Sequence, residues 1–224
     1  NNIYNDDHLF LVFSDESEKQ LFQNSYPDLR YRAIVYTDDP ALLEVESNPA
    51  AQRKFFGIKH IFDNTDFERI GMIDDDSRFI RHMDYDDLFM KHLNKKTVHT
   101  TFVPMTDNLV QIIQGCLRFF GQKDREKLRQ ITRDFSTFFW FNDIPVFERE
   151  NFYDFCDFMD LKTIKNEFTK YDFEHILYVY FLLITDRVNL DVVNYMLPVP
   201  YGGFVELQRY INPPDFDAVY NHME

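Results

Sequence analysis

Positive charge is scarce in this chain of 224 residues, because 24 Lys and Arg residues stand against 38 Asp and Glu residues, giving a formal net charge of -14. Such an excess of negative charge is repelled by phosphate backbones and by anionic lipids, so we expect neither nucleic acid nor an acidic membrane as the main partner. Long apolar runs are also lacking, and none approaches the roughly 20 residues that span a bilayer. The polar start carries no basic stretch typical of a signal peptide, so we expect a soluble or cytoplasmic protein without an integral membrane segment.

Cysteine is almost absent, and the two that occur, Cys116 and Cys156, lie in segments with helical periodicity and form no Cys-x-x-Cys pattern. We expect two reduced, buried thiols with no part in chemistry. Internal repeats and low-complexity linkers are missing as well, which predicts one domain over residues 1–224. Aromatic residues are abundant at 17%, which indicates a substantial core.

The most informative segment is a short apolar run, Ile70-Gly71-Met72-Ile73, that leads directly into Asp74-Asp75-Asp76. The run predicts a buried strand, and such a strand cannot enclose three unpartnered carboxylates, so the acids must emerge at its end. Clustered carboxylates repel one another unless a cation neutralises them, and hard divalent ions prefer oxygen ligands. The segment therefore predicts a divalent-metal site, with a solvated acidic turn as the alternative.

Strands and helices alternate in the pattern before this junction. We expect strands over residues 8–13, 32–36 and 70–73, with a helix after each of the first two; the second is expected over residues 49–62. This order predicts an α/β fold with a doubly wound, Rossmann-type sheet flanked by helices. Ligands bind beyond the carboxyl ends of the strands in such sheets, so the residues that follow the three strands should line one cleft.

The remaining elements are predicted from shorter patterns. The set comprises strands over residues 98–103 and 138–141 and helices over residues 108–120, 125–135, 149–159 and 172–183.

Four segments, in this order along the chain, resemble the GT-A fold glycosyltransferases that bind nucleotide-sugars through a D-x-D motif. The strongest is Asp74-Asp75-Asp76-Ser77-Arg78-Phe79-Ile80, which is similar to the family's "D-s-D-t-v-F-i" segment. The other three are Gln52-Arg53-Lys54-Phe55-Phe56-Gly57-Ile58-Lys59, Asp143-Ile144-Pro145-Val146 and Phe173-Glu174-His175-Ile176-Leu177-Tyr178. The last departs from the family's "S-E-Y-x-L-Y" at Phe173 and His175.

The resemblance implies a GT-A-like catalytic domain, with about residues 1–105 binding the nucleotide-sugar and about residues 106–224 binding the acceptor. It implies transfer of a hexosyl or pentosyl group from a nucleotide-diphosphate donor to a hydroxyl of a glycan or other acceptor, with manganese or magnesium (Mn2+ or Mg2+) as cofactor. The implied metal ligands are Asp74, Asp76 and His222. The implied nucleotide-sugar contacts are Ser14, Thr37, Asp38, Gln52, Lys54, Lys59, Asp74 and Asp75.

Glu174 is the implied general base, with Asp143 and Asp172 in reserve. Glu174 and Tyr178 are four residues apart on one flank of a helix whose apolar residues form a stripe, so both can face one cleft. A carboxylate there can accept the proton of an attacking hydroxyl. The alternative is an anion that stabilises a helix N-terminus, without any chemistry.

Two other functions stay open from the sequence. A haloacid-dehalogenase-type phosphohydrolase also places D-x-D after an apolar strand, although there the motif comes near the start of the chain. A non-enzymatic acidic module that binds carbohydrate or calcium would suit the aromatic content, but the sequence has no EF-hand loop.

Overall fold

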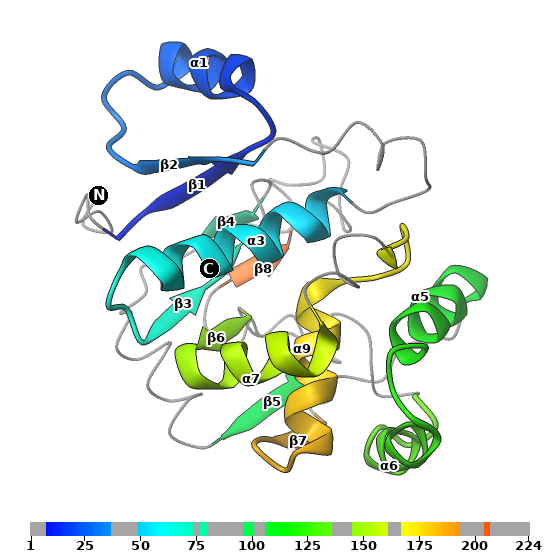
Figure 1. The fold of residues 1–224 in the computed structure, drawn as a ribbon. Helices are drawn as coiled ribbons and strands as arrows, with labels where there is room; N and C mark the ends of the chain where they lie inside the picture. Colours follow the sequence, from blue (N-terminus) through cyan, green and yellow to red (C-terminus); the bar gives the residue numbers. More distant parts are fainter. Residues whose placement is uncertain are drawn as a thin grey trace, which may run out of the picture.

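The computed structural model describes residues 8–36, 49–73, 77–79, 96–100, 106–135, 145–160, 167–192 and 204–206. In these ranges the chain is a mixed α/β structure of helices and short strands (Figure 1). The helices are α1 Glu16–Ser25, α3 Pro49–Asn64, α5 Asp107–Leu117, α6 Gln122–Ile131, α7 Arg149–Met159 and α9 Glu174–Ile184. The strands are β1 Phe10–Phe13, β2 Arg32–Val35, β3 Arg69–Gly71, β4 Ser77–Phe79, β5 Thr97–Thr100, β6 Val146–Glu148, β7 Asn189–Val192 and β8 Phe204–Glu206.

The described strands form four hydrogen-bonded pairs. β1–β2 and β5–β7 are parallel, and β3–β6 and β4–β8 are antiparallel. The expected β-α-β start is confirmed, since α1 connects the parallel strands β1 and β2. In the described ranges β3 does not join them; it pairs with β6, with Gly71 opposite Val146. This partner was not predicted because β6 has only three residues, and the strand expected over residues 138–141 lies outside the described residues.

Helix α3 connects the β1–β2 pair to the rest of the molecule. A Cβ atom on Gly57 would lie 2.7 Å from Cγ2 of Val12, so the backbones of α3 and β1 approach too closely for a side chain there. Nearby, the rings of Tyr36 and Phe56 stack with centroids 5.1 Å apart. On its other side, α3 inserts Phe55 against Phe152 of α7, with ring centroids 5.2 Å apart.

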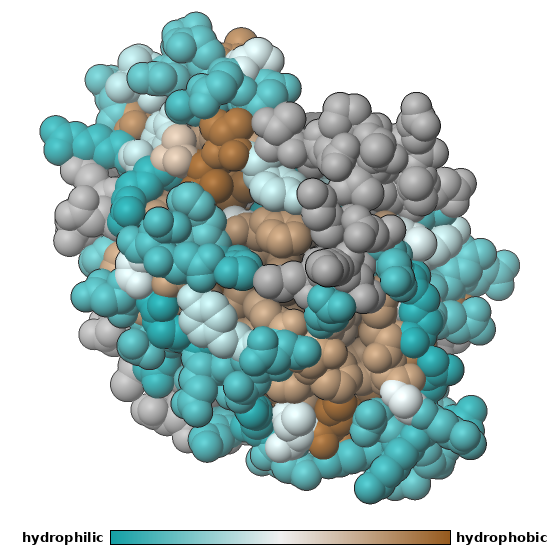
Figure 2. Space-filling model, viewed as in Figure 1, coloured by the Kyte–Doolittle hydropathy of each residue, from teal (hydrophilic) through white to brown (hydrophobic). Residues whose placement is uncertain are grey.

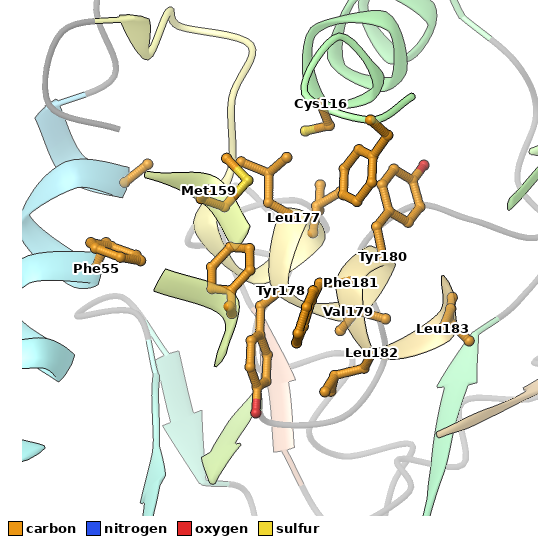
Figure 3. Packing of buried hydrophobic residues seen from close by; sticks show 14 of the residues in the cluster. Phe55, Cys116, Met159, Leu177, Tyr178, Val179, Tyr180, Phe181, Leu182 and Leu183 are labelled. Carbon is orange, nitrogen blue, oxygen red and sulfur yellow. The ribbon is translucent and has the colours of Figure 1, made fainter. Parts of the chain in front are cut away.

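Helix α9 is the centre of the core. It lies between α3 and α7 on one side and α5 and α6 on the other (Figure 1). Every residue from Glu174 to Leu183 is buried, so the expected single apolar stripe is wrong: the helix is buried on all sides. Figure 3 shows Tyr178 and Tyr180 leaving this helix in different directions, each into packed side chains.

The abundant aromatic residues form the expected core. Phe147 lies 4.6 Å from Tyr178 between ring centroids, and Phe155 lies 5.5 Å from the same ring. Both cysteines are buried and unpaired, as predicted. Burial raises the pKa of Cys156 to about 12 and that of Cys116 further still, so both thiols stay protonated and unreactive at neutral pH.

The outer face in Figure 2 is mostly hydrophilic, and its apolar side chains gather over the β1–β2 pair and along α9 between α7 and α5. No helix in the described ranges is long and apolar enough to cross a membrane.

Candidate functional site

The strand that leads to the acidic cluster emerges at the surface just before it. Ile70 and Met72 pack against the core, whereas Ile73 is 45% exposed. β3 therefore alternates between core and solvent and is not the fully buried strand that we expected. The N–H of Met72 donates to the carbonyl of Pro145 at 2.9 Å, which holds the end of this strand beside β6. The chain reaches the surface at Ile73. The three acids that follow in the sequence need water or a ligand around them, since unpartnered carboxylates are costly to bury.

Several predicted site residues lie outside the described residues. They are Asp74, Asp75 and Asp76, the donor-site residues Thr37 and Asp38, the reserve base Asp143 and the metal ligand His222. Within the described ranges, no three His, Cys, Asp or Glu side chains are placed to hold a metal ion together.

Ser14 follows β1 and takes part in the cap of α1. Its N–H and its hydroxyl both donate to Oε2 of Glu18 at 2.6 Å, and Oδ1 of Asp15 accepts from the N–H of Glu18 at 2.8 Å. Asp15 and Glu18 thus form a capping-box arrangement, with the Glu18 carboxylate reaching back to Ser14. The bonds from Ser14 lower the pKa of Glu18.

The predicted phosphate contacts on α3 have different environments. Gln52 is buried with only 2% of its surface exposed. Nζ of Lys59 pairs with Oδ2 of Asp63 at 2.6 Å, and that carboxylate also accepts a hydrogen bond from Tyr153 of α7 at 2.8 Å. Asp63 therefore joins α3 to α7 through Tyr153, and Lys59 pairs with the same carboxylate within α3. Lys54 is partly exposed on the same helix.

One cation near the carboxyl end of β1 was not predicted. Hydrogen bonds from Ser17 and Ser14 are the main causes that lower the pKa of Asp15 and of Glu18, and the charge of Arg53 on α3 adds a smaller contribution to each. The sequence offered no signal for this, because the proximity depends on how α3 packs on β1.

Glu174 is the first residue of α9 and is 1% exposed. Its Oε1 lies 3.4 Å from Nδ1 of His175, and its Oε2 has no hydrogen-bond partner among the described residues. A buried carboxylate oxygen left in this state is unfavourable by about 1–3 kcal/mol or more. The described packing around the start of α9 gives no structural reason for this unbonded Oε2 of Glu174.

Asp172, the second reserve base, is fully buried and strongly bound. Its carboxylate accepts from the N–H of Thr169 at 2.5 Å and pairs with Nη2 of Arg118 at 2.8 Å. Burial raises the pKa of Asp172, and the bonds from Thr169 and Arg118 oppose that rise. These contacts favour a structural role, in which Asp172 fixes the turn before α9.

Tyr178 is separated from Glu174 by one helical turn but faces a different environment. Its hydroxyl accepts from the N–H of Glu148 at 3.2 Å, and the residue lines a cavity of about 640 Å³. His175 lines the same cavity, whereas Glu174 does not belong to its wall. The expected shared cleft of Glu174 and Tyr178 is therefore not this cavity.

No protein-family model, curated protein or solved structure matches this chain. A functional assignment has to come from the chain's own residues.

Proposed function

We propose that this protein is a metal-dependent glycosyltransferase with a GT-A-like fold, which transfers a sugar from a nucleotide-diphosphate donor to a hydroxyl of a glycan or similar acceptor. The observation that carries the proposal is the path of β3, which leaves the core at the exposed Ile73 and continues into Asp74-Asp75-Asp76. Three successive acids at a strand end form an oxygen-rich ligand set for a hard divalent ion.

In this proposal Asp74, Asp76 and His222 hold Mn2+ or Mg2+, and Asp75 contacts the donor. The ion supplies Lewis-acid stabilisation of the charge that develops on the leaving diphosphate. The protein's strong negative charge makes such a counter-ion necessary for a phosphorylated ligand.

The donor's nucleoside would lie at the carboxyl ends of β1 and β2. Because these strands are parallel, their carboxyl ends lie at one edge of the pair, and Ser14 follows β1 there. In this proposal Thr37 and Asp38, which come after β2 in the sequence, contact the donor together with Ser14. Lys59 with Gln52, or else Lys54, would meet the phosphates from α3.

Glu174 is the proposed general base. The support is its buried Oε2, which lacks a partner in the described part of the chain, at the positive N-terminal end of α9. An acceptor hydroxyl reaching this oxygen would supply the missing donor and give up its proton there.

A thermal-shift screen of nucleoside diphosphates and their sugars, with and without manganese, tests the proposal. A bound donor at 100 times its Kd should stabilise the fold by about 2.7 kcal/mol. We expect stabilisation only when manganese and the matching donor are both present, and slow manganese-dependent hydrolysis of that donor. Asp76→Ala should lose both effects, whereas Asp28→Ala, which removes an exposed acid beyond α1, should keep both.

Two outcomes would favour the other functions. Hydrolysis of p-nitrophenyl phosphate that disappears in Asp74→Asn would indicate a phosphohydrolase. Binding of sugars or calcium without any nucleotide effect would indicate a non-enzymatic module.

A further inference from the structure

A cavity of about 640 Å³ lies where β3, β5, β6, α7 and α9 meet. The wall includes Glu68 and Arg69, at the start of β3, and residues 96–98, at the start of β5. The beginning of α7, one side of α9 and the loop before β7 complete it. This volume is within the range of about 300–1,000 Å³ that is usual for small-molecule sites.

The cavity extends along β3. Arg69, Thr97 and Val188 lie at or just before the first residues of β3, β5 and β7. Pro145 and Val146 also line it, and they lie opposite Met72 and Gly71 at the carboxyl end of β3.

The charges around the cavity balance, unlike those of the whole chain. Among the described lining residues, four side chains are cationic, Arg69, Lys96, Arg149 and Arg187, and four are anionic, Glu68, Glu148, Glu150 and Asp186. This described part of the lining therefore has a formal net charge of zero, not counting His175, in a chain whose net charge is -14. A multivalent anion would meet four carboxylates here, and a polycation would meet four cations, so neither is favoured.

A chain of hydrogen bonds fixes the polar groups of the wall. Nε of Arg69 donates to Oε1 of Glu148 at 3.3 Å, and Nδ2 of Asn151 donates to the other oxygen of Glu148 at 2.7 Å. Arg187 then donates from Nη1 to Oδ1 of Asn151 at 2.7 Å and from Nη2 to Asp154 at 2.5 Å. These bonds orient the guanidinium groups, the amide and the carboxylates that border the cavity.

Part of the lining is apolar and includes one phenol. It consists of Val98, Val179, Leu182 and Tyr178, whose hydroxyl accepts from the N–H of Glu148. A lining that combines fixed donors and acceptors with apolar side chains matches a sugar ring, which has hydroxyls around its edge and C–H groups on its faces. Each hydroxyl donates one hydrogen bond and accepts others, so it can bridge neighbouring cations and carboxylates.

We propose that this cavity binds a short, neutral oligosaccharide. The binding needs neither nucleotide nor metal. It would hold part of a glycan acceptor in a glycosyltransferase, and it would also be present if the protein had no transferase activity.

Isothermal titration with neutral trisaccharides of glucose, mannose and xylose, in the absence of nucleotide and metal, tests this site. The test variant is Lys96→Gln/Glu150→Gln, which removes one exposed cation and one acid from the wall and keeps the net charge. The matched control is Lys19→Gln/Glu16→Gln, which makes the same change at a surface ion pair on α1. We expect at least one trisaccharide to bind, with Kd about tenfold or more weaker in the cavity variant and unchanged in the control and in Asp76→Ala.

Hydrogen exchange gives a second readout that needs no variant. The trisaccharide should slow exchange of the backbone amides in residues 146–151, which border the cavity. Absence of binding by all three sugars, equal affinity in the cavity variant, or preferential binding of inositol hexakisphosphate or spermine would overturn the proposal. Loss of donor binding in Asp76→Ala with retained trisaccharide binding would separate this site from the transferase.

Discussion

At the scale of single residues, several side chains can serve either the fold or a ligand, and their contacts distinguish the two roles. Lys59 is bound to Asp63, and Asp172 is bound to Arg118 and Thr169, so the described packing accounts for both side chains. Glu174 differs, because its Oε2 has no partner in the described ranges. Ser14 is intermediate: it is part of a cap, yet it follows β1 at the edge where the proposed donor would bind.

Ser14→Ala separates these two roles. Losing the hydroxyl bond to Glu18 should lower the free energy of unfolding by about 0.5–1 kcal/mol and move the pKa of Glu18 up toward 4.5. The pKa of Glu18 in the folded state is below 4.5, so the stabilisation is present above pH 4.5 and is lost as the pH falls through the folded value. Urea unfolding at several pH values and an NMR titration of Glu18 measure both effects.

The matched control for this variant is Ser25→Ala, whose hydroxyl donates to the carbonyl of Leu21 and to no carboxylate. That substitution should leave the pKa of Glu18 unchanged. If Ser14→Ala also leaves it unchanged, the cap assignment is wrong. If Ser14→Ala weakens nucleotide-sugar binding by more than its loss of stability explains, Ser14 also belongs to the donor site.

At the scale of helices, the ends of α3 and α9 are fixed by side chains from other elements. Arg149, at the start of α7, donates to the carbonyls of Phe62 at 2.5 Å, Thr65 at 2.6 Å and Phe67 at 2.9 Å. Lys127 of α6 donates to the carbonyl of Ile184 at 2.8 Å, at the end of α9. A cation at a helix C-terminus satisfies carbonyls that have no partner within the helix, and it interacts favourably with the helix dipole.

Arg149→Met should destabilise the protein by about 2–4 kcal/mol, because three carbonyls lose a charged donor at once. Arg149→Lys keeps the charge but lacks the planar fork that reaches three acceptors, so it should recover only a small part of the loss. Arg129→Met, at an arginine whose side chain is 60% exposed, is the control and should change stability little. Equal stability of Arg149→Lys and the wild type in urea unfolding would show that charge alone fixes the end of α3.

Gly115 of α5 tests how closely that helix approaches the turn before α9. A Cβ atom there would lie 2.9 Å from Cβ of Tyr171 and 3.1 Å from both the carbonyl oxygen of Tyr171 and Oδ1 of Asp172. Alanine improves helix propensity by about 1 kcal/mol, but overpacking against backbone typically destabilises by about 1–3 kcal/mol. We therefore expect Gly115→Ala to destabilise by about 1 kcal/mol in urea unfolding.

The control for this contact is Gly121→Ala, where the nearest atom would lie 3.6 Å away at Asp124. Its effect should be within about 0.5 kcal/mol. A gain in stability in Gly115→Ala would mean that the turn at residues 171–172 can move, and that Asp172 does not fix the start of α9.

At the scale of the whole molecule, the elements were easier to predict from the sequence than their arrangement. Helical periodicity predicted α7 with its observed bounds and α3 to within two residues, because both carry a clear apolar face. The strands β4, β6, β7 and β8 were missed, since none of them carries an apolar run as long as those of β1 and β2. Their pairing depends on tertiary packing.

The same limit applies to the candidate site. Ser14 was located correctly just after β1 and Glu174 in the first turn of α9, because the strand and helix patterns that place them are local. The proximity of Arg53 to the cap of α1, and the cavity between β3 and α9, depend on contacts between segments far apart in the chain. No pattern in one sequence encodes such contacts.

Glu174 is expected to affect both the stability of the whole molecule and the proposed reaction. Its Oε2, without a partner among the described residues, should cost about 1–3 kcal/mol, and an anion at a helix N-terminus returns about 0.3–1 kcal/mol. Replacing it with an apolar side chain of similar length, Glu174→Met, should therefore stabilise the fold by about 1–2 kcal/mol. In a protein of this size that corresponds to a rise in Tm of about 2–8 °C in calorimetry.

If Glu174 is the base, Glu174→Met should abolish sugar transfer, and Glu174→Gln should abolish it equally. The gain in Tm should be smaller in Glu174→Gln, because the amide keeps a buried polar group. Such a gain in stability with a loss of turnover is expected where a site is kept polar for chemistry. A fall in Tm in Glu174→Met would instead mean that the carboxylate has a structural partner. Unchanged turnover in both variants would remove Glu174 from the reaction and leave the acidic cluster after β3 as the basis of the proposed function.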